Sequence, residues 1–442
     1  MNIPILICLL FFNISFNYCT NILTIPFESK LCKSNEKEEF LSNYYEQFLY
    51  TQVTIGSDNQ KLELSLKLNK YITYIIGSKI SNLKSDFFNE KKSETYEEIS
   101  TKVIEPNDEI FIKGIKSSDN FIFGENIKYD KYIFYLSQKQ NFDETGQIGL
   151  KMIPLNVDKD FSGEGFVDQL KVKSLISSYN FYFKYEVKDE NEFKYKGNLI
   201  IGGMPHEIEP SELFNYNNFV QTYAEINELN TRWVIKISSV SYGNEIITEN
   251  DSAEFSTTFG FILAPVNFIP IFDKFFNNDN CNKEHNGEYL YLYCDKYVDI
   301  TQFKDIFFRT SNKELNFTLT YKDLFRKIGD NYYFLILFNE DTNQWEFGHI
   351  FLKKYIMVFN GDKRTIGYYY QSGDNDKKSN IFTIYILIII SIIFGITIIG
   401  LLIYIFYFKP KNRKVRPNEL EDNFDYTPQD VEKDQDDNRL GV

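Results

Sequence analysis

The chain has 442 residues, of which 43% are hydrophobic and 17% aromatic, and its formal net charge is −14 at pH 7. This length is sufficient for two domains, or for one large domain with two lobes. The acidic balance and the lack of a basic stripe in the body of the chain argue against nucleic acid as a partner.

Residues 1–20 are predicted to be a secretory signal peptide. The run from Ile3 to Phe12 is apolar and uncharged, and it is too short to span a bilayer. The rest of the chain is therefore expected to enter an oxidising compartment.

A second apolar run lies near the C-terminus. Residues Ile381 to Phe408 contain no charged side chain, and about 20 apolar residues suffice for a transmembrane helix. Five Lys and Arg residues follow between Lys409 and Arg416, which favours a cytosolic location for that end. We therefore predict a single-pass type I membrane protein with an extracellular or lumenal ectodomain. A linker at 372–380 would precede the helix, and an acidic, disordered cytosolic tail would occupy 409–442.

The body of the chain is predicted to be mostly β. It is rich in Phe and Tyr, which favour strands, and it has few segments with helical periodicity. Two sequons, NDS at Asn250 and NFT at Asn316, predict glycosylation of surface loops.

Cys281 and Cys294 are predicted to form a disulfide, because they bracket a glycine turn that leads into a strand. A zinc site that includes His285 is the alternative. Only three candidate ligands are nearby, however, and their spacing matches no zinc pattern. We expect no metal and no cofactor.

A series of motifs in the body combines apolar strands with glycines. "GNLIIGGMPHE" (197–207) is followed by "RWVIKISSVSYGNEI", then by "AEFSTTFGFILAP" (253–265), and finally by "WEFGHIFLKKYIMVFNGDKRTIGYY" (345–369). This series resembles the pepsin-like aspartic peptidases, whose last segment reads W-ILG-D-x-FLR-x-Y-x-x-VFD. The likeness extends from about Leu49 to Tyr370, which is most of the ectodomain.

The resemblance implies an all-β, bilobal fold with two β-barrel-like lobes around a central cleft. We place the N-terminal lobe at 45–205 and the C-terminal lobe at 206–371. In this family each lobe supplies one Asp in an Asp-Thr/Ser-Gly turn, and the two carboxyl groups share a proton because they cannot both ionise. One then acts as a base on water and the other as an acid on the peptide carbonyl.

Both acids are missing from the aligned positions. In the first lobe, Ile55-Gly56 and Gln60 set the register, and the catalytic triplet falls on Lys67-Leu68-Asn69. In the second, Ala253 and Pro265 match the pattern and place Ser256 where Asp belongs. Asp251 offers another register, but it comes five residues too early. The chain contains no Asp-Thr-Gly and no Asp-Ser-Gly.

The hairpin that covers the cleft in this family is expected around Gly114, Ser117 and Ser118, with no Tyr at its usual position. Catalysis by Ser256 as a nucleophile with Lys67 as its base is a further alternative, but the fold has no oxyanion hole arranged for it.

Three functions are compatible with these observations. The first, which we favour, is a non-catalytic membrane protein that binds a peptide or protein partner. The second is an active aspartic endopeptidase with atypical catalytic motifs. The third is a structural surface protein. The membrane and a ligand in the cleft are therefore the expected partners.

Overall fold

The computed structural model describes residues 21–31, 47–78, 87–103, 114–124, 127–137, 146–153, 163–186, 195–211, 213–226, 231–310, 316–370 and 394–400. The predicted signal peptide, the linker and the cytosolic tail lie outside these residues. The chain divides into two compact units, Met1–Gln371 and Ser372–Val442. All of the described hydrophobic clusters belong to the first unit, which therefore has a core of its own.

Two mixed β-sheets build the first unit, as the composition predicts. One has thirteen strands in the order β11-β24-β23-β9-β10-β1-β2-β3-β8-β4-β7-β6-β5. Its strands are β1 (Leu23–Leu31), β2 (Gln47–Ile55), β3 (Gln60–Lys67), β4 (Tyr74–Ile76), β5 (Glu97–Val103), β6 (Gly114–Phe123), β7 (Ile127–Ser137), β8 (Gly146–Gly149), β9 (Asn180–Glu186), β10 (Lys196–Ile201), β11 (Phe219–Tyr223), β23 (Val358–Asn360) and β24 (Thr365–Tyr369).

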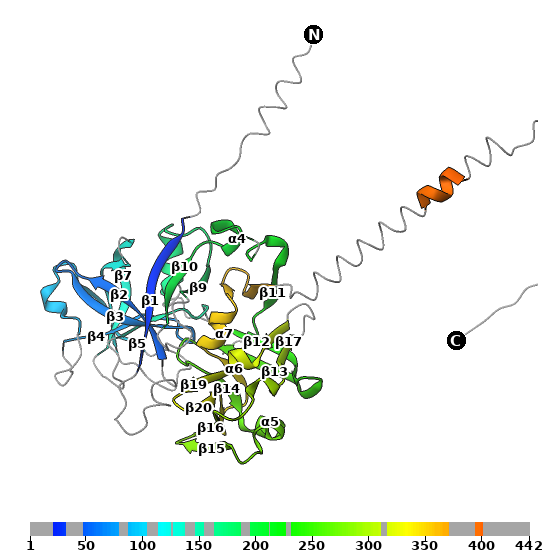
Figure 1. Cartoon of the computed structure of the whole chain (residues 1–442). Coiled ribbons are helices and arrows are strands. Elements are labelled where there is room, and N and C mark those ends of the chain that lie inside the picture. Colours follow the sequence, from blue (N-terminus) through cyan, green and yellow to red (C-terminus); the bar gives the residue numbers. More distant parts are fainter. Residues whose placement is uncertain are drawn as a thin grey trace, which may run out of the picture. The chain divides into compact units, whose positions relative to one another are not determined.

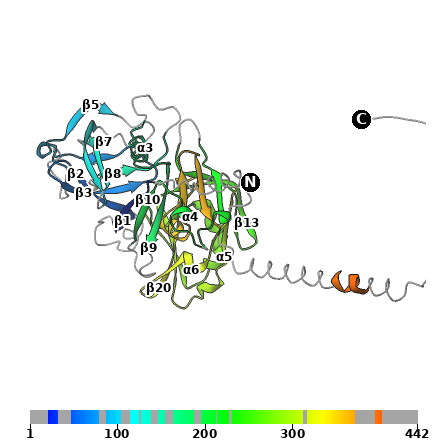
Figure 2. The same cartoon turned by 90° about the horizontal axis from the view of Figure 1, so that it is seen from above.

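The other sheet has eleven strands in the order β18-β17-β12-β13-β22-β14-β21-β16-β20-β19, with β15 paired to β16. They are β12 (Val234–Tyr242), β13 (Glu245–Phe255), β14 (Ile262–Pro265), β15 (Cys281–Asn286), β16 (Tyr289–Asp295), β17 (Ile306–Thr310), β18 (Asn316–Leu319), β19 (Phe325–Ile328), β20 (Asn331–Phe334), β21 (Ile336–Asn339) and β22 (Trp345–Phe347). Figures 1 and 2 show β2–β8 grouped on one side and the strands of this second sheet on the other.

Short helices connect the strands. The α-helices are α3 (Phe166–Val172), α4 (Pro205–Ile208), α5 (Ile269–Phe276), α6 (Tyr321–Leu324) and α7 (His349–Lys354). The 3₁₀ turns are η1 (Glu90–Lys92), η3 (Tyr216–Asn218), η4 (Val266–Phe268) and η5 (Ile300–Gln302). The segment "GFVDQLKVKSLISSYNFYFKY" (165–185) forms α3 and most of β9.

The same strand arrangement occurs once in each sheet. In the first, the hairpin β2–β3 is followed by β4, and β3 pairs in parallel with β8, β8 with β4 in antiparallel, and β4 with β7 in parallel. In the second, the hairpin β12–β13 is followed by β14. Here β13 pairs in parallel with β22, β22 with β14 in antiparallel, and β14 with β21 in parallel. The molecule is thus built from two related β-lobes, in agreement with the expected bilobal fold.

Three strands from the C-terminal half, β11, β23 and β24, belong to the thirteen-stranded sheet. They adjoin β9 and β10, so this sheet continues beyond the N-terminal lobe. The sequence analysis also missed β1, which lies between β10 and β2. Its buried residues Ile25 and Phe27 alternate with exposed ones, as is typical of a strand with one face on the core.

The disulfide predicted between Cys281 and Cys294 is confirmed. The two cysteines are directly opposite each other in the β15–β16 hairpin, with their Cα atoms 4.0 Å apart. Among the described residues, no group of three or more His, Cys, Asp or Glu is placed to hold a metal ion.

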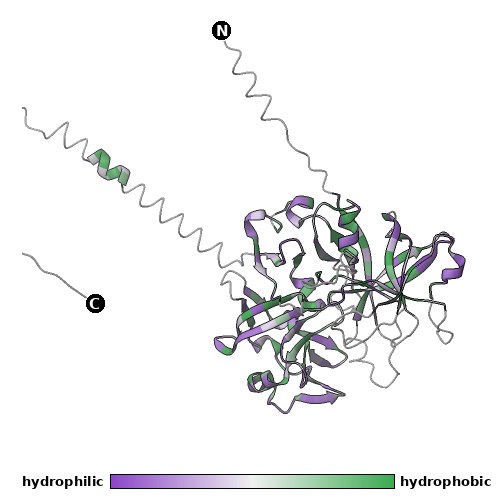
Figure 3. Cartoon of the chain, turned by 180° about the vertical axis from the view of Figure 1, so that it is seen from behind, coloured by the Kyte–Doolittle hydropathy of each residue, from purple (hydrophilic) through white to green (hydrophobic). Residues whose placement is uncertain are grey.

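Most of the predicted transmembrane segment Ile381–Phe408 lies outside the described residues. Its described part, 394–400, is helical and mostly hydrophobic (Figure 3). Within the described parts of the chain, no helix has both the length and the hydropathy needed to cross a bilayer.

Candidate functional site

The N-terminal lobe contributes the end of β3. Lys67 is its last residue, and its Cα partner on the parallel strand β8 is Gly149. The carbonyl of Lys67 accepts a hydrogen bond of 2.8 Å from the N–H of Leu150. A Cβ atom at position 149 would lie 2.5 Å from the carbonyl oxygen of Lys70, so the close approach of these segments requires glycine.

The C-terminal lobe contributes the end of β13 in the same way. Phe255, the last residue of β13, pairs with Phe347 of the parallel strand β22. The next residue, Ser256, donates its N–H to the carbonyl of Phe347 at 3.0 Å and so lies beside Gly348. A Cβ atom on Gly348 would lie 2.1 Å from the carbonyl oxygen of Phe261.

Lys67 and Ser256 therefore occupy equivalent places in the two lobes. Lys67 is the last residue of β3 and lies beside Gly149 at the end of the parallel strand β8. Ser256 directly follows β13 and lies beside Gly348, which directly follows the parallel strand β22. The strand pairings thus relate Lys67 to Ser256 through the repeated strand arrangement of the two lobes.

The two strand ends are in direct contact. The buried hydroxyl of Thr257 donates to the carbonyl of Leu66 at 2.6 Å and accepts from the N–H of Leu68 at 3.3 Å. These two backbone groups flank Lys67. We call residues 66–69 and 256–258 together the turn pair. A single side chain of the C-terminal lobe thus fixes the position of the opposite turn.

No carboxylate lies at either equivalent position. Lys67 is 7% exposed, and its ammonium nitrogen lies 3.3 Å from the centroid of the Phe48 ring. Such cation–π contacts offset part of the cost of removing an ammonium group from water. Ser256 is also 7% exposed, and its hydroxyl accepts a hydrogen bond from the N–H of Thr258 at 3.2 Å.

Asp251, which offers the alternative register, is inside β13 opposite Ile237 and away from the strand end. Its carboxylate accepts hydrogen bonds from the Trp345 indole N–H and from the N–H of Ser252. The carboxylate therefore already has partners within its own lobe.

A buried histidine links the two lobes next to the turn pair. His349, the first residue of α7, donates from Nε2 to the carbonyl of Gln47 at 2.5 Å, and Nδ1 accepts from the Tyr185 hydroxyl at 3.0 Å. These roles require the neutral imidazole. Burial lowers the pKa of His349 from 6.5 to about 4, and the positive charge of Lys67 acts in the same direction.

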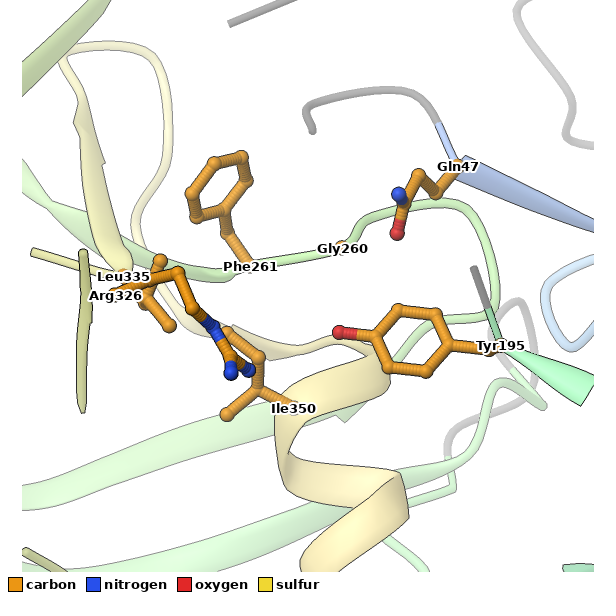
Figure 4. A pocket seen from close by; sticks show the side chains of 7 residues that line it. All are labelled: Gln47, Tyr195, Gly260, Phe261, Arg326, Leu335 and Ile350. Carbon is orange, nitrogen blue, oxygen red and sulfur yellow. The ribbon is translucent and has the colours of Figure 1, made fainter. Parts of the chain in front are cut away.

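A small cavity adjoins this histidine. It is lined by Gln47, Tyr195, Gly260, Phe261, Arg326, Leu335 and Ile350. Figure 4 shows the Gln47 amide and the Tyr195 hydroxyl near one another on one side of it, and Arg326 on the other. Its volume of about 10 Å³ corresponds to a single water molecule. This cavity cannot hold a peptide side chain.

Two glutamates lie on the face of the sheet that Ser256 shares, and the sequence analysis missed them. Glu254 and Glu346 are Cα partners on the parallel strands β13 and β22, so their side chains share a face. Glu254 precedes Ser256 by two residues and, because side chains alternate along a strand, points the same way. Phe255 and Phe347 face the core instead.

The pKa values of both carboxyl groups of this pair are raised. Arg232 and Gln344 donate to Oε2 of Glu254 at 3.2 and 2.9 Å. Burial nevertheless raises the pKa of Glu254. Burial, followed by the negative charge of Glu254, raises the pKa of Glu346 to about 7. Both shifts favour the protonated form of a carboxyl group relative to an exposed glutamate.

A signal for these glutamates is present in the sequence. Glu346 interrupts the apolar segment before Gly348, where the family pattern has W-ILG, and Glu254 alternates with Ser256. A charge in an otherwise apolar strand is a reason to expect a specific partner.

The other predicted site residues lie elsewhere. Gly114 begins β6, and Ser117 and Ser118 are buried where this strand pairs with β5; the tip of this hairpin, 104–113, is outside the described residues. Both sequon asparagines are exposed. Asn250 borders a hollow of about 460 Å³ on the C-terminal lobe.

A family model for eukaryotic aspartyl proteases matches residues 48–369, which include the turn pair, His349 and both glutamates. The chain belongs to the eukaryotic aspartyl protease family. No curated protein matches it. Lys67 and Ser256, the positions at which we expect each lobe to supply an acid, both lie within the matched residues.

Proposed function

We propose that this protein is a membrane-anchored, non-catalytic member of the aspartyl protease family that binds a peptide or protein partner on the extracellular or lumenal side. The observation that carries the proposal is the chemistry of the turn pair: the equivalent positions of the two lobes hold an ammonium group and a hydroxyl group. Neither group is a carboxylate that could accept a proton from water, so the water-activating step of the family has no base at these two positions.

A fold of this family can still recognise an extended chain when the turn pair carries no acid. Strand ends and neighbouring pockets bind peptides through main-chain hydrogen bonds, and these do not need the catalytic acids.

A second candidate function is proteolysis by atypical groups, and one observation favours it. Glu254 and Glu346 are adjacent carboxyl groups on the face that Ser256 shares, and the pKa of Glu346 is raised to about 7. A base and an acid of this kind are what the family's reaction needs. Against it, Glu254 is already held by Arg232 and Gln344.

Activity of the purified full chain on an unfolded protein, measured from acidic to neutral pH, tests both candidates. We expect no cleavage above the level of a Lys67→Ala/Ser256→Ala double variant. Cleavage that disappears in a Glu254→Gln/Glu346→Gln variant would establish the second candidate and overturn the first.

Partner binding is tested by selecting peptides from a random library on the full chain. The enriched peptides should bind much more weakly to a Lys67→Glu variant and with unchanged affinity to Lys236→Glu, whose side chain is exposed on β12. Equal binding to both variants would place the ligand away from the turn pair.

A further inference from the structure

One outer surface of the first unit combines exposed apolar residues with the point where the chain leaves the fold. Its residues are Leu213, Tyr216, Tyr223 and Tyr370, and we call it the exit face. Beneath it lies a small apolar cluster on the outer side of the thirteen-stranded sheet, which includes Tyr182, Ile200, Val358, Tyr369, Phe214 and Phe219. The labels α4 and β11 mark this region in Figure 1.

The exit face is unusually apolar for a solvent-exposed surface. Leu213 is 56% exposed, Tyr216 70% and Tyr223 79%. Tyr216 is fixed by the ring of His206, whose centroid is 5.2 Å away. Tyr223 points to the same side of β11 as Phe219, because the two residues are four positions apart on one strand. Tyr216 and Tyr223 are therefore presented from elements that pack on the fold.

The chain leaves the first unit at this same surface. Its last strand, β24, pairs with β11 from Phe219↔Tyr369 to Tyr223↔Thr365. The N–H of Tyr370 then donates to the carbonyl of Asn218 at 2.8 Å, in the turn that also contains Tyr216. Only ten residues, 371–380, separate this point from the apolar run that begins at Ile381.

This short separation limits the distance between the exit face and a bilayer. Ten residues span at most about 35 Å when fully extended, and a flexible chain of that length spans on average about half as much. An ectodomain of this size has a radius of gyration of about 20 Å. The surface around Tyr370 is therefore held at a high effective concentration next to the lipid.

We propose that the exit face rests on the membrane, with Leu213, Tyr216 and Tyr223 in contact with the lipid headgroup region. This inference rests on the membrane anchor of the proposed function. Tyrosines are enriched at membrane interfaces because an apolar ring and a polar hydroxyl suit the boundary between lipid and water. Weak contacts suffice, since the anchor already supplies the proximity.

The charges of the exit face select neutral lipids. Glu207 and Glu225 are exposed near the apolar residues, whereas Glu209, also exposed, is paired with Lys184. The two remaining carboxylates disfavour an anionic surface. Apolar and aromatic contacts must therefore supply the binding, and these depend little on ionic strength. A zwitterionic bilayer is the surface that matches this chemistry.

Photo-crosslinking of the full chain in phosphatidylcholine nanodiscs tests the proposal. Benzoylphenylalanine replaces Tyr216, Tyr223 or, as a matched control, Tyr297, which is 79% exposed like Tyr223 but follows β16 in the second sheet. We expect lipid adducts at positions 216 and 223 in several-fold higher yield than at 297. The yield should change little with salt and should fall when phosphatidylserine is added.

The possible failures are distinguishable. Equal adduct yields at all three positions, or none at 216 and 223, in a chain that is inserted in nanodiscs, would overturn the exit-face proposal and leave the anchor intact. A chain that does not insert at all would overturn the anchor, and the exit-face proposal with it. Adducts to a second copy of the chain instead of lipid would show that the face serves self-association and would also overturn the proposal.

Discussion

The ends of β3 and β13 have the same backbone surroundings and different side chains. Each is the end of the second strand of a hairpin, and that strand pairs with a parallel neighbour. Each also lies beside a glycine whose surroundings leave no room for a Cβ atom. At the end of β3, Lys67 places its ammonium group over the Phe48 ring, and the flanking Leu66 carbonyl and Leu68 N–H face the C-terminal lobe. At the end of β13, Ser256-Thr257-Thr258 supplies the hydroxyl that binds those groups.

The difference shows that the contact between the lobes and the catalytic chemistry make separate demands on the same turn. The contact is formed by the Thr257 hydroxyl with the Leu66 carbonyl and the Leu68 N–H, and it requires no carboxyl group. The chemistry needs a carboxyl group at each strand end, and neither turn has one. The contact between the two strand ends therefore forms without a carboxyl group in either turn.

The largest expected effect comes from removing the hydroxyl that joins the two turns. Thr257→Val keeps the shape of the side chain but leaves the Leu66 carbonyl and the Leu68 N–H buried without their partner. We expect a loss of about 3 to 4 kcal/mol in the free energy of unfolding, since each stranded group costs about 1–3 kcal/mol. Denaturant titration of the full chain measures it. Thr257→Ser, which keeps the hydroxyl, should lose much less, and equal losses would contradict the role of the hydrogen bonds.

The next largest expected effect is a loss of stability at acidic pH that depends on His349. The pKa of His349 is lowered to about 4 in the fold, so below 6.5 the unfolded chain binds a proton that the native chain does not. Stability should therefore fall as the pH drops from 6.5 towards 4, by up to about 3 kcal/mol. His349→Gln should flatten this part of the stability profile. A profile with unchanged slope would show that the histidine is not buried in the neutral form.

Glu346 should have the opposite pH dependence. Its pKa is raised to about 7, so between 4.5 and 7 the native chain binds a proton that the unfolded chain does not, and stability falls as the pH rises. Glu346→Gln removes this penalty and should stabilise the protein above pH 7 by about 2 kcal/mol, after allowance for partial exposure.

Thermal unfolding of this variant at acidic and at alkaline pH measures the difference. The gain should vanish below pH 4.5, where the wild-type carboxyl group is protonated in both states. Glu340→Gln is a suitable control, because Glu340 is exposed at the end of β21. A gain that is independent of pH would contradict the raised pKa.

The smallest effect is expected at Lys67. Lys67→Met keeps most of the aliphatic side chain over Phe48 and removes the ammonium group. The loss should be about 1 kcal/mol, the size of a partly desolvated cation–π contact. Lys236→Met, at an exposed position of β12, provides the baseline for the same substitution. A variant more stable than the wild type would show that the cost of burying the charge exceeds the benefit of the ring.

Much of this fold could be predicted from local patterns. The glycine-ended strands at "NLIIGG" and "WEFG" and the disulfide between Cys281 and Cys294 follow from spacing and turn chemistry. The strand β1 was missed, because its pairing with β10 joins residues far apart in the chain. No local pattern reports such a partner.

The sequence by itself determined which chemical groups stand at the two strand ends, because the flanking motifs set the register and the residues there can be read directly. Only the tertiary structure decided what those groups meet: the Thr257 hydroxyl between two backbone groups of the other lobe, the neutral His349 between Gln47 and Tyr185, and Glu346 beside Glu254. The physical reason is that hydrogen bonds and pKa values depend on distance and burial, and both are set by strand pairings between segments remote in sequence.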